Sequence, residues 1–264
     1  MPRLDSTRYT VLFAVAVSVV CALLVATAAV GLRERQETNA LLYKQKNVLL
    51  AAGLVKPDQS LSTAEVVTIF ERRIRMRGVD LQTGQLLPED KFDAKGYDQR
   101  KARNDPALSR PAPANDAKVA RLPNIGTVYQ VTAADGAVEQ LVLPIEGMGM
   151  WGTLYGFLAM DRDGNTVRGL TFYEQKETPG LGGEISNPTW QALWVGRKAY
   201  DANWAPQLSV IKGRAGPPEQ DPHHVDGLSG ATITSNGVTR VVRFWLSAGG
   251  YAPYLKSLRS GAPS

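Results

Sequence analysis

Cysteine and histidine are scarce in this sequence. Its 264 residues include one cysteine, Cys21, and two histidines, His223 and His224. A single cysteine excludes an internal disulfide, a CxxC redox pair and an iron–sulfur cluster held by the chain's own thiolates. The histidines lie near Asp226, but neighbouring side chains point apart and a third ligand is missing, so we expect no metal site. Any redox centre of this chain must therefore be organic.

The sequence also lacks a long block of basic residues. The formal net charge is +5, but lysines and arginines are interleaved with acidic residues along the chain. Proteins that bind nucleic acids concentrate their positive charge in a patch or stripe. The sequence therefore predicts no nucleic-acid partner.

One long apolar run is present, and it lies near the N-terminus. Residues 9–32 contain no charge and are bracketed by Arg8 and Arg33. About 20 apolar residues in a helix cross a bilayer. The alternative is a cleaved signal peptide, because the ATA sequence at 26–28 resembles a cleavage site. Signal peptides have apolar regions of about 7–15 residues, so we expect a retained anchor in the lipid bilayer.

The flanking charges predict the orientation of this anchor. Arg3 and Arg8 precede it, whereas Arg33 and Arg35 follow it. Positive residues in short loops favour the cytoplasmic side. Together with the amino terminus, Arg3 and Arg8 predict a cytoplasmic N-terminus at residues 1–8 and a body on the other side of the membrane.

After the membrane segment we expect the anchor helix to continue into solvent, followed by a second helix and an irregular segment up to residue 122. Apolar residues at helical spacing over 41–52 end at Gly53, and a capping-box pattern at 62–65 starts a second helix. Its expected apolar face carries Val66, Ile69, Phe70 and Ile74. Residues 86–122 are charged and rich in proline, so we expect a surface excursion or linker there. We assign this segment no role.

From residue 123 the pattern changes to strands separated by turns. Residues 128–131 and 138–145 flank Asp135-Gly136, and residues 154–160 and 167–173 flank Asp163-Gly164, which predicts two hairpins. Asn187-Pro188 predicts a helix start, residues 208–211 a strand, and residues from Ser235 or Asn236 to Leu246 a final helix. Antiparallel hairpins with helices predict an α+β fold over 123–264, preceded by a helical and linker region over 33–122.

A G-x-G-x-x-G pattern occurs at Gly147, Gly149 and Gly152, directly after an expected strand. A dinucleotide site requires a helix after this pattern, because the helix N-terminus binds the pyrophosphate. The residues that follow, TLYGFLAMD, are typical of a strand. We therefore expect no nicotinamide site, and a soluble NAD-dependent dehydrogenase is a rejected alternative.

Two other loops have the composition of a ligand site. Residues 226–235, DGLSGATITS, combine small residues and hydroxyls before the final helix, which favours phosphate binding. Residues 174–183, EQKETPGLGG, form a stiff glycine-rich loop against which a flat ring could lie. Each loop alone could also be an ordinary turn: a capped helix start in the first case, a strand-to-helix turn in the second.

Together these loops resemble the FMN-binding domain family, in which a serine or threonine of a D-x-x-[ST]-G-A-[ST] motif is flavinylated. Asp226, Ser229, Gly230, Ala231 and Thr232 match the motif. Within that family the chain resembles the C subunits of Na+-translocating NADH:quinone reductases. This resemblance is carried by the single anchor and by residues 147–161, 170–185 and 224–238.

The resemblance implies an FMN covalently attached by a phosphoester to Thr232 and installed by a separate flavin transferase. It also places the flavin ring against the loop from Glu177 to Gly182. The expected cofactor-binding residues are Thr232, Asp226, Ser229, Gly230, Ala231, Thr234, Glu177, Thr178, Gly180, Leu181 and Gly182. From the residues themselves we add Trp151 as a stacking partner and Lys212 as a charge partner. No catalytic residue is expected.

The implied function is an electron relay in a respiratory complex of the bacterial inner membrane, with the FMN domain, residues 123–264, on the periplasmic side. The resemblance places NADH oxidation and quinone reduction on other subunits of this sodium-translocating complex. Two alternatives stay open at this point. One is the homologous FMN-carrying protein of an Rnf-type electron-transport complex, and the other is a membrane-anchored FMN-binding module without a redox role.

Overall fold

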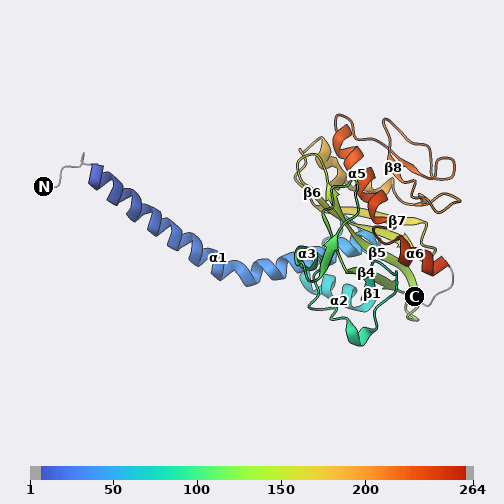
Figure 1. Ribbon diagram of the computed structural model, residues 1–264, viewed down its shortest axis with the longest axis horizontal. Coiled ribbons are helices and arrows are strands. Elements are labelled where there is room, and N and C mark those ends of the chain that lie inside the picture. The colour runs from blue at the N-terminus through green and yellow to red at the C-terminus, as the bar shows by residue number, and fades with distance from the viewer. Residues whose placement is uncertain (1–6, 260–264) are drawn as a thin grey trace. The chain divides into compact units, whose positions relative to one another are not determined.

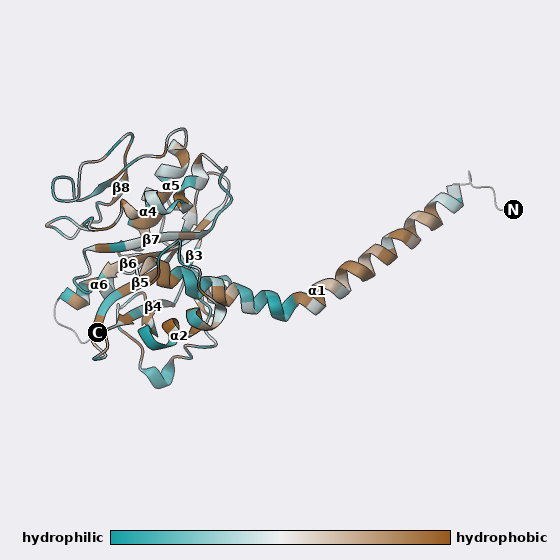
Figure 2. Ribbon diagram, turned by 180° about the vertical axis from the view of Figure 1, so that it is seen from behind, coloured by the Kyte–Doolittle hydropathy of each residue, from teal (hydrophilic) through white to brown (hydrophobic). Residues whose placement is uncertain are grey.

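The computed structural model of the protein describes residues 7–259, which fall into two compact units, residues 7–44 and 45–259. Helix α1, Thr7–Ala51, is continuous, and its apolar N-terminal stretch is followed by a hydrophilic one (Figure 2). Among the described residues α1 is the one helix that is long and apolar enough to cross a membrane. The predicted anchor lies within it. Of the predicted cytoplasmic N-terminus, residues 1–6 lie outside the described range.

Helix α2, Thr63–Arg73, begins at the predicted capping box. The Ser62 hydroxyl accepts a hydrogen bond from the Glu65 N–H at 3.3 Å, and the Glu65 carboxylate accepts one from the Ser62 N–H at 2.8 Å. The prediction that Ile74 lies on this helix is wrong. Ile74 is the first residue of strand β1, Ile74–Asp80, and pairs with Val131. Its place is fixed by a partner strand that is distant in the sequence.

A five-stranded antiparallel sheet forms the centre of the body, in the order β1-β4-β5-β6-β7 (Figure 1). The other strands are β4, Ile125–Thr132; β5, Val138–Met148; β6, Thr153–Asp161; and β7, Val167–Glu174. The two predicted hairpins are β4–β5 and β6–β7, and both are confirmed. The α+β fold class is confirmed with them.

Each face of the sheet supports a separate hydrophobic core. Successive residues of a strand point to opposite faces, and β5 shows this alternation: Leu141 and Leu143 belong to one core and Val142 to the other. The first core includes α5, whereas the second contains the end of α1 and residues of α2. The sheet is therefore covered on both faces, and the ends of its strands remain available for loops.

Residues 86–122 contain short regular elements, although an irregular segment was expected. They form η1, Glu89–Lys91; α3, Gln99–Asn104; β2, Ser109–Pro111; and β3, Arg121–Pro123, with β2 paired to β3. Ala117 and Leu122 are buried in the first core. The Gln99 side-chain oxygen accepts a hydrogen bond from the Thr127 N–H at 2.7 Å. Most of the segment lies at the surface, as a surface excursion would, but it is folded and these residues pack it against the body.

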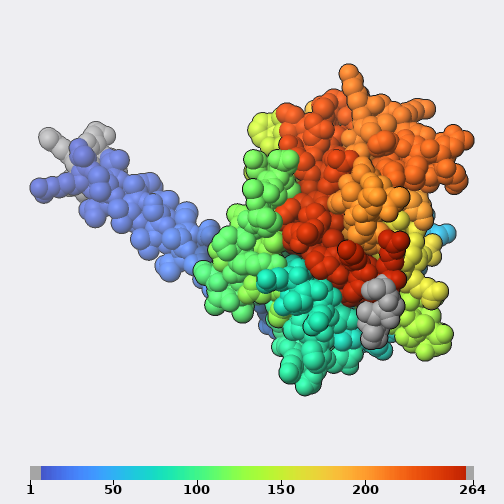
Figure 3. All heavy atoms as spheres, turned by 45° about the vertical axis from the view of Figure 1, so that its right-hand side comes forward, coloured from blue at the N-terminus to red at the C-terminus, as the bar shows by residue number. Residues whose placement is uncertain are grey.

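The elements after β7 are short, apart from α5. They are η2, Gly182–Ser186; α4, Pro188–Ala192; β8, Ser209–Val210; β9, His224–Val225; α5, Thr232–Trp245; and α6, Ala252–Arg259. On the face in Figure 3, the red C-terminal helices lie between the green middle of the chain and the orange loops. Asn187 caps α4 as predicted, by accepting from the Thr189 N–H at 3.0 Å. Helix α5 begins at Thr232, earlier than the predicted Ser235 or Asn236, because the Ala231 carbonyl already accepts from the Ser235 N–H.

Candidate functional site

Three loops that are separated in the sequence meet at one edge of the body. They are the glycine turn at 147–152 between β5 and β6, the loop at 177–183 after β7, and the first turn of α5. A Cβ atom built on Gly237 of α5 would lie 2.9 Å from the Met148 carbonyl oxygen. A Cβ on Gly182, in the loop after β7, would collide with Oγ1 of Thr234 in the first turn of α5. The loops pack at backbone distance, so the two sequence motifs and the glycine turn form one site.

Glu177 joins these three loops. Its side chain is buried, and Oε1 accepts hydrogen bonds from the N–H groups of Met150 and Trp151, both at 3.0 Å. Its other oxygen, Oε2, accepts a hydrogen bond from the Thr234 hydroxyl. Both carboxylate oxygens are therefore occupied by protein donors. Its expected contact with the cofactor stays a prediction, and its position fits a residue that holds the loops together.

The N-terminus of α5 has free backbone donors. Ala231 is the N-cap residue and provides no side-chain cap. The Ser235 N–H donates to the Ala231 carbonyl oxygen. The backbone N–H groups of Thr232, Ile233 and Thr234, which precede it, have no acceptor among residues 7–259. Unpaired N–H groups at a helix start carry partial positive charge and favour phosphate. Gly230, with a φ of 72°, makes the turn that leads into this helix start.

The four hydroxyl groups of the loop at 226–235, which contains the motif, fall into two classes. Thr234 and Ser235 are buried: Thr234 donates to Glu177, and the Ser235 hydroxyl accepts from the Leu228 N–H at 3.3 Å. Ser229 and Thr232 are exposed. Only these two hydroxyls of the motif are accessible to a modifying enzyme, and Thr232 is the one on the helix itself.

Asp226 does not face the helix start as a free carboxylate. Its Oδ1 accepts a hydrogen bond from the Ala215 N–H at 2.9 Å, and its carbonyl oxygen accepts from the Trp190 indole N–H at 2.9 Å. It therefore fixes the loop around 211–216 and α4 beside the motif. Lys212 lies in that loop, is exposed, and has no ion pair within residues 7–259. Its predicted role as a charge partner stays a prediction.

Large apolar side chains remain exposed on the same loops. They are Met148, Met150, Trp151, Leu181 and Ile233, and Trp151 keeps 62% of its surface exposed. Thr178 and Gly180 are also exposed on the loop that carries Leu181. A cluster of exposed apolar side chains is typical of a binding surface. Around a phosphate-binding helix start, it fits a ligand with an anionic end and a flat apolar part.

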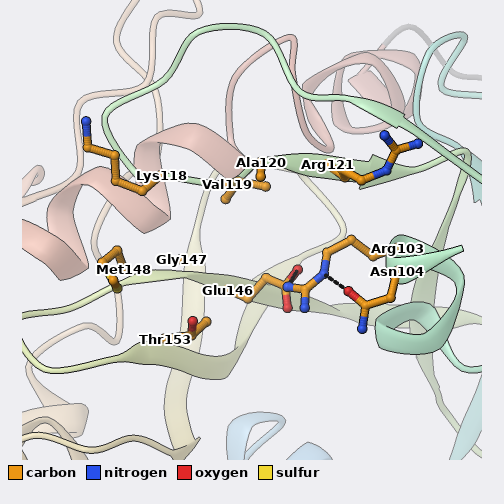
Figure 4. A pocket seen from close by; sticks show the side chains of 10 residues that line it. All are labelled: Arg103, Asn104, Lys118, Val119, Ala120, Arg121, Glu146, Gly147, Met148 and Thr153. Carbon is orange, nitrogen blue, oxygen red and sulfur yellow. Dashed lines mark hydrogen bonds and ion pairs between the residues drawn. The ribbon is translucent and has the colours of Figure 1, made fainter. Parts of the chain in front are cut away.

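A cavity of about 280 Å³ with several charged residues in its lining lies next to the glycine turn (Figure 4). It is lined by Arg103, Asn104, Lys118, Val119, Ala120, Arg121, Glu146, Gly147, Met148 and Thr153. Glu146 is buried, and its Oε1 lies 2.5 Å from Nη1 of Arg103. Burial raises the pKa of Glu146, and the Arg103 guanidinium offsets part of this effect. Sequence reasoning missed this pair, because no local pattern links α3 to the end of β5.

The structure also shows the surroundings of the G-x-G-x-x-G pattern and of the two histidines. Strand β6 follows the G-x-G-x-x-G pattern, as predicted, in place of the helix that a dinucleotide site requires. Nδ1 of His223 lies 2.8 Å from the Lys198 carbonyl oxygen, and Nδ1 of His224 lies 2.6 Å from Asp221. These contacts fit the expected loop role of both histidines.

Comparison with known proteins agrees with this geometry. Residues 149–247 match the family model of the FMN-binding domain. The C subunit of the Na(+)-translocating NADH-quinone reductase of Yersinia pestis is 45% identical over 260 residues, which cover 98% of this chain and 95% of that protein. The protein of the same name from Pseudomonas aeruginosa is 46% identical over 264 residues, which cover 99% of each chain.

Solved structures show the same similarity. The crystal structure of Shewanella oneidensis NqrC is 30% identical, with a TM-score of 0.76, and the match covers 86% of this chain and 99% of that one. Fold, loops and matched domain together define a protein of the FMN-binding domain class. The chain belongs to the family of C subunits of the Na(+)-translocating NADH-quinone reductase. Matches over nearly the whole length favour this family over the Rnf-type alternative.

Proposed function

We propose that the chain carries FMN covalently, through a phosphoester between the Thr232 hydroxyl and the FMN phosphate. The main support for this proposal is the position of Thr232. It is an exposed residue on the first turn of α5, which has no side-chain cap. A phosphate esterified there would lie beside the free N–H groups of that turn. Formation of the ester from FMN releases one water, and a separate flavin transferase is the partner that installs it.

The surrounding residues fit the rest of the cofactor. The loop from Glu177 to Gly182 and the exposed side chains of Trp151 and Leu181 offer apolar surface for the isoalloxazine ring. Ser229, Gly230 and Ala231 would lie along the phosphate, with Lys212 in the adjacent loop as a charge partner. When bound, FMN supplies the capacity to accept and donate single electrons. The chain's own residues hold it in place and set the charge around it.

The proposed role is that of an electron relay within a sodium-translocating NADH:quinone reductase of the bacterial inner membrane. The full-length relatives carry that name. In this role the other subunits of the complex hold the NADH and quinone sites and couple electron transfer to sodium transport. Helix α1 anchors the chain in the bilayer, with the N-terminus in the cytoplasm and the FMN domain in the periplasm.

The attachment is tested by intact mass after co-expression of the full-length chain with a flavin transferase. We expect a mass increase of one FMN less one water, and a fluorescent band after denaturing electrophoresis. Thr232→Val should abolish both signals, whereas Ser229→Ala, at the other accessible hydroxyl, should retain them. Retention in Thr232→Val together with loss in Ser229→Ala would move the attachment to Ser229.

A further inference from the structure

We propose that Glu177 is a positioning residue that, together with Thr234, fixes the orientation of the flavin and lowers its midpoint potential. This inference rests on the proposed attachment of FMN to Thr232. Glu177 does this by holding the glycine turn and the first turn of α5 in a single arrangement. Its own oxygens are committed to protein donors, so it acts on the cofactor through the loops and through its charge.

The geometry around Glu177 leaves little freedom. One oxygen is bound by two successive backbone N–H groups, those of Met150 and Trp151, and the other by the Thr234 hydroxyl. A glycine lies close to each oxygen of the Glu177 carboxylate. A Cβ on Gly149 would lie 2.6 Å from Oε1, and a Cβ on Gly182 would lie 2.8 Å from Oε2. Both approaches are too close for any side chain. The carboxylate is therefore enclosed by backbone as well as bound by it.

Thr234 carries this constraint to the attachment point. Thr232 and Thr234 lie in the same first turn of α5, so fixing the Thr234 side chain also fixes the rotation of that turn. The Trp151 N–H on the opposite side fixes the backbone from which the exposed indole extends. Glu177 thus sets the position of the ester and that of the proposed stacking partner relative to each other.

The charge of Glu177 has no cationic partner in the described part of the chain. No ion pair of Glu177 occurs among residues 7–259, and all three of its side-chain partners are donors, the pattern of an ionised carboxyl group. A buried negative charge interacts more strongly with a nearby centre than an exposed one does. Because reduction adds negative charge to the flavin, Glu177 should make that reduction less favourable.

The test uses the full-length chain co-expressed with a flavin transferase, in five forms. These are the parent, Glu177→Gln, Thr234→Val, Thr234→Ser and the double variant Glu177→Gln/Thr234→Val. Intact mass reports attachment, a redox titration followed by visible absorption gives the midpoint potential, and visible circular dichroism reports the flavin's surroundings. Glutamine keeps the shape and one acceptor oxygen but removes the charge, and serine keeps the hydroxyl that valine lacks.

We expect attachment in all five forms. The midpoint potential of Glu177→Gln should shift to a more positive value, and its visible dichroism should change. Thr234→Val should change the dichroism, whereas Thr234→Ser should match the parent. Since Thr234 carries no charge, the double variant should have nearly the same midpoint potential as Glu177→Gln alone.

An attached flavin in Glu177→Gln with the parent's potential and dichroism would overturn the inference and leave the proposed function intact. If Glu177→Gln does not fold, the comparison of Thr234→Val with Thr234→Ser decides, and identical dichroism in these two overturns it. Lack of covalent FMN in the parent would instead refute the proposed function.

Discussion

Two buried glutamates lie near the glycine turn, and their surroundings differ. Glu146, near the end of β5, faces the Arg103 guanidinium from α3. Glu177 faces two backbone N–H groups and one hydroxyl. A pair of opposite charges joins two segments of the body, whereas a carboxylate held by dipoles keeps its net charge. The first arrangement serves stability, and the second leaves a charge that can act on a ligand.

The largest effect is expected where the charge pair is broken. Arg103→Leu would leave Glu146 buried without its cation, and the free energy of unfolding should fall by roughly 3 kcal/mol. Denaturant unfolding followed by tryptophan fluorescence measures this change. Arg168→Leu is the control, because its pair with Asp161 is more exposed and should contribute less than about 1 kcal/mol. Equal losses in the two variants would refute the special role of the Arg103 pair.

Adding a side chain to the glycine turn next to Glu177 should destabilise the protein nearly as much as the loss of Arg103. Gly149→Ala would place a methyl group 2.6 Å from Oε1 of Glu177 and 2.8 Å from Leu154, at a cost of about 2 kcal/mol. Gly152→Ala is the matched control, since the nearest atoms to its methyl group would belong to the flexible Lys176 side chain, at 3.2 Å. Thermal unfolding compares the two. A Gly149→Ala protein as stable as Gly152→Ala would show that the turn is not tightly packed.

Removal of the charge of Glu177 should affect stability less than removal of Arg103. Glu177→Gln retains an acceptor but presents an amide N–H₂ to one set of donors, which costs about 1 kcal/mol. The same unfolding experiment as for Arg103→Leu provides the value. A loss as large as that of Arg103→Leu would show that Glu177 is above all a structural residue, as Glu146 is.

The smallest effect is a dependence on pH. Burial raises the pKa of Glu146 above its usual 4.5, although Arg103 offsets part of the rise. The folded chain then holds this proton more tightly than the unfolded chain, so the free energy of unfolding falls as pH rises from 4.5 through the raised value. Glu146→Gln removes this dependence. The free energy of unfolding of Glu146→Gln minus that of the parent should therefore increase over that pH range. At higher pH it should stay constant. A difference independent of pH would contradict the raised pKa.

The sequence was a good guide to elements that local chemistry determines. The hairpins follow from Asp-Gly turns between apolar strands, and α2 begins at a capping box made within four residues. Elements stabilised by distant partners were missed. Strand β1 exists through its pairing with β4, and α3 is held by Gln99 contacting Thr127. The residues of β1 and α3 themselves contain no pattern that indicates these distant partners.

The candidate site shows the same division. Its two loops could be found from glycines and hydroxyls in a short motif. The start of α5 at Thr232 was missed, because threonine and isoleucine are weak helix formers and the turn has no side-chain cap. The use of Glu177 as a bridge could not be predicted either, since its three donors come from two distant segments.

The end of α1 has a practical consequence for biochemistry. Val48, Leu49 and Ala51 are buried in the second core, and a Cβ on Gly169 of β7 would lie 2.2 Å from the Ala51 carbonyl oxygen. The last turns of the helix that carries the membrane segment are thus a structural part of the water-exposed body. A fragment freed of its anchor should be cut ahead of Gln45, because a later cut would remove side chains that fill the core beneath the sheet.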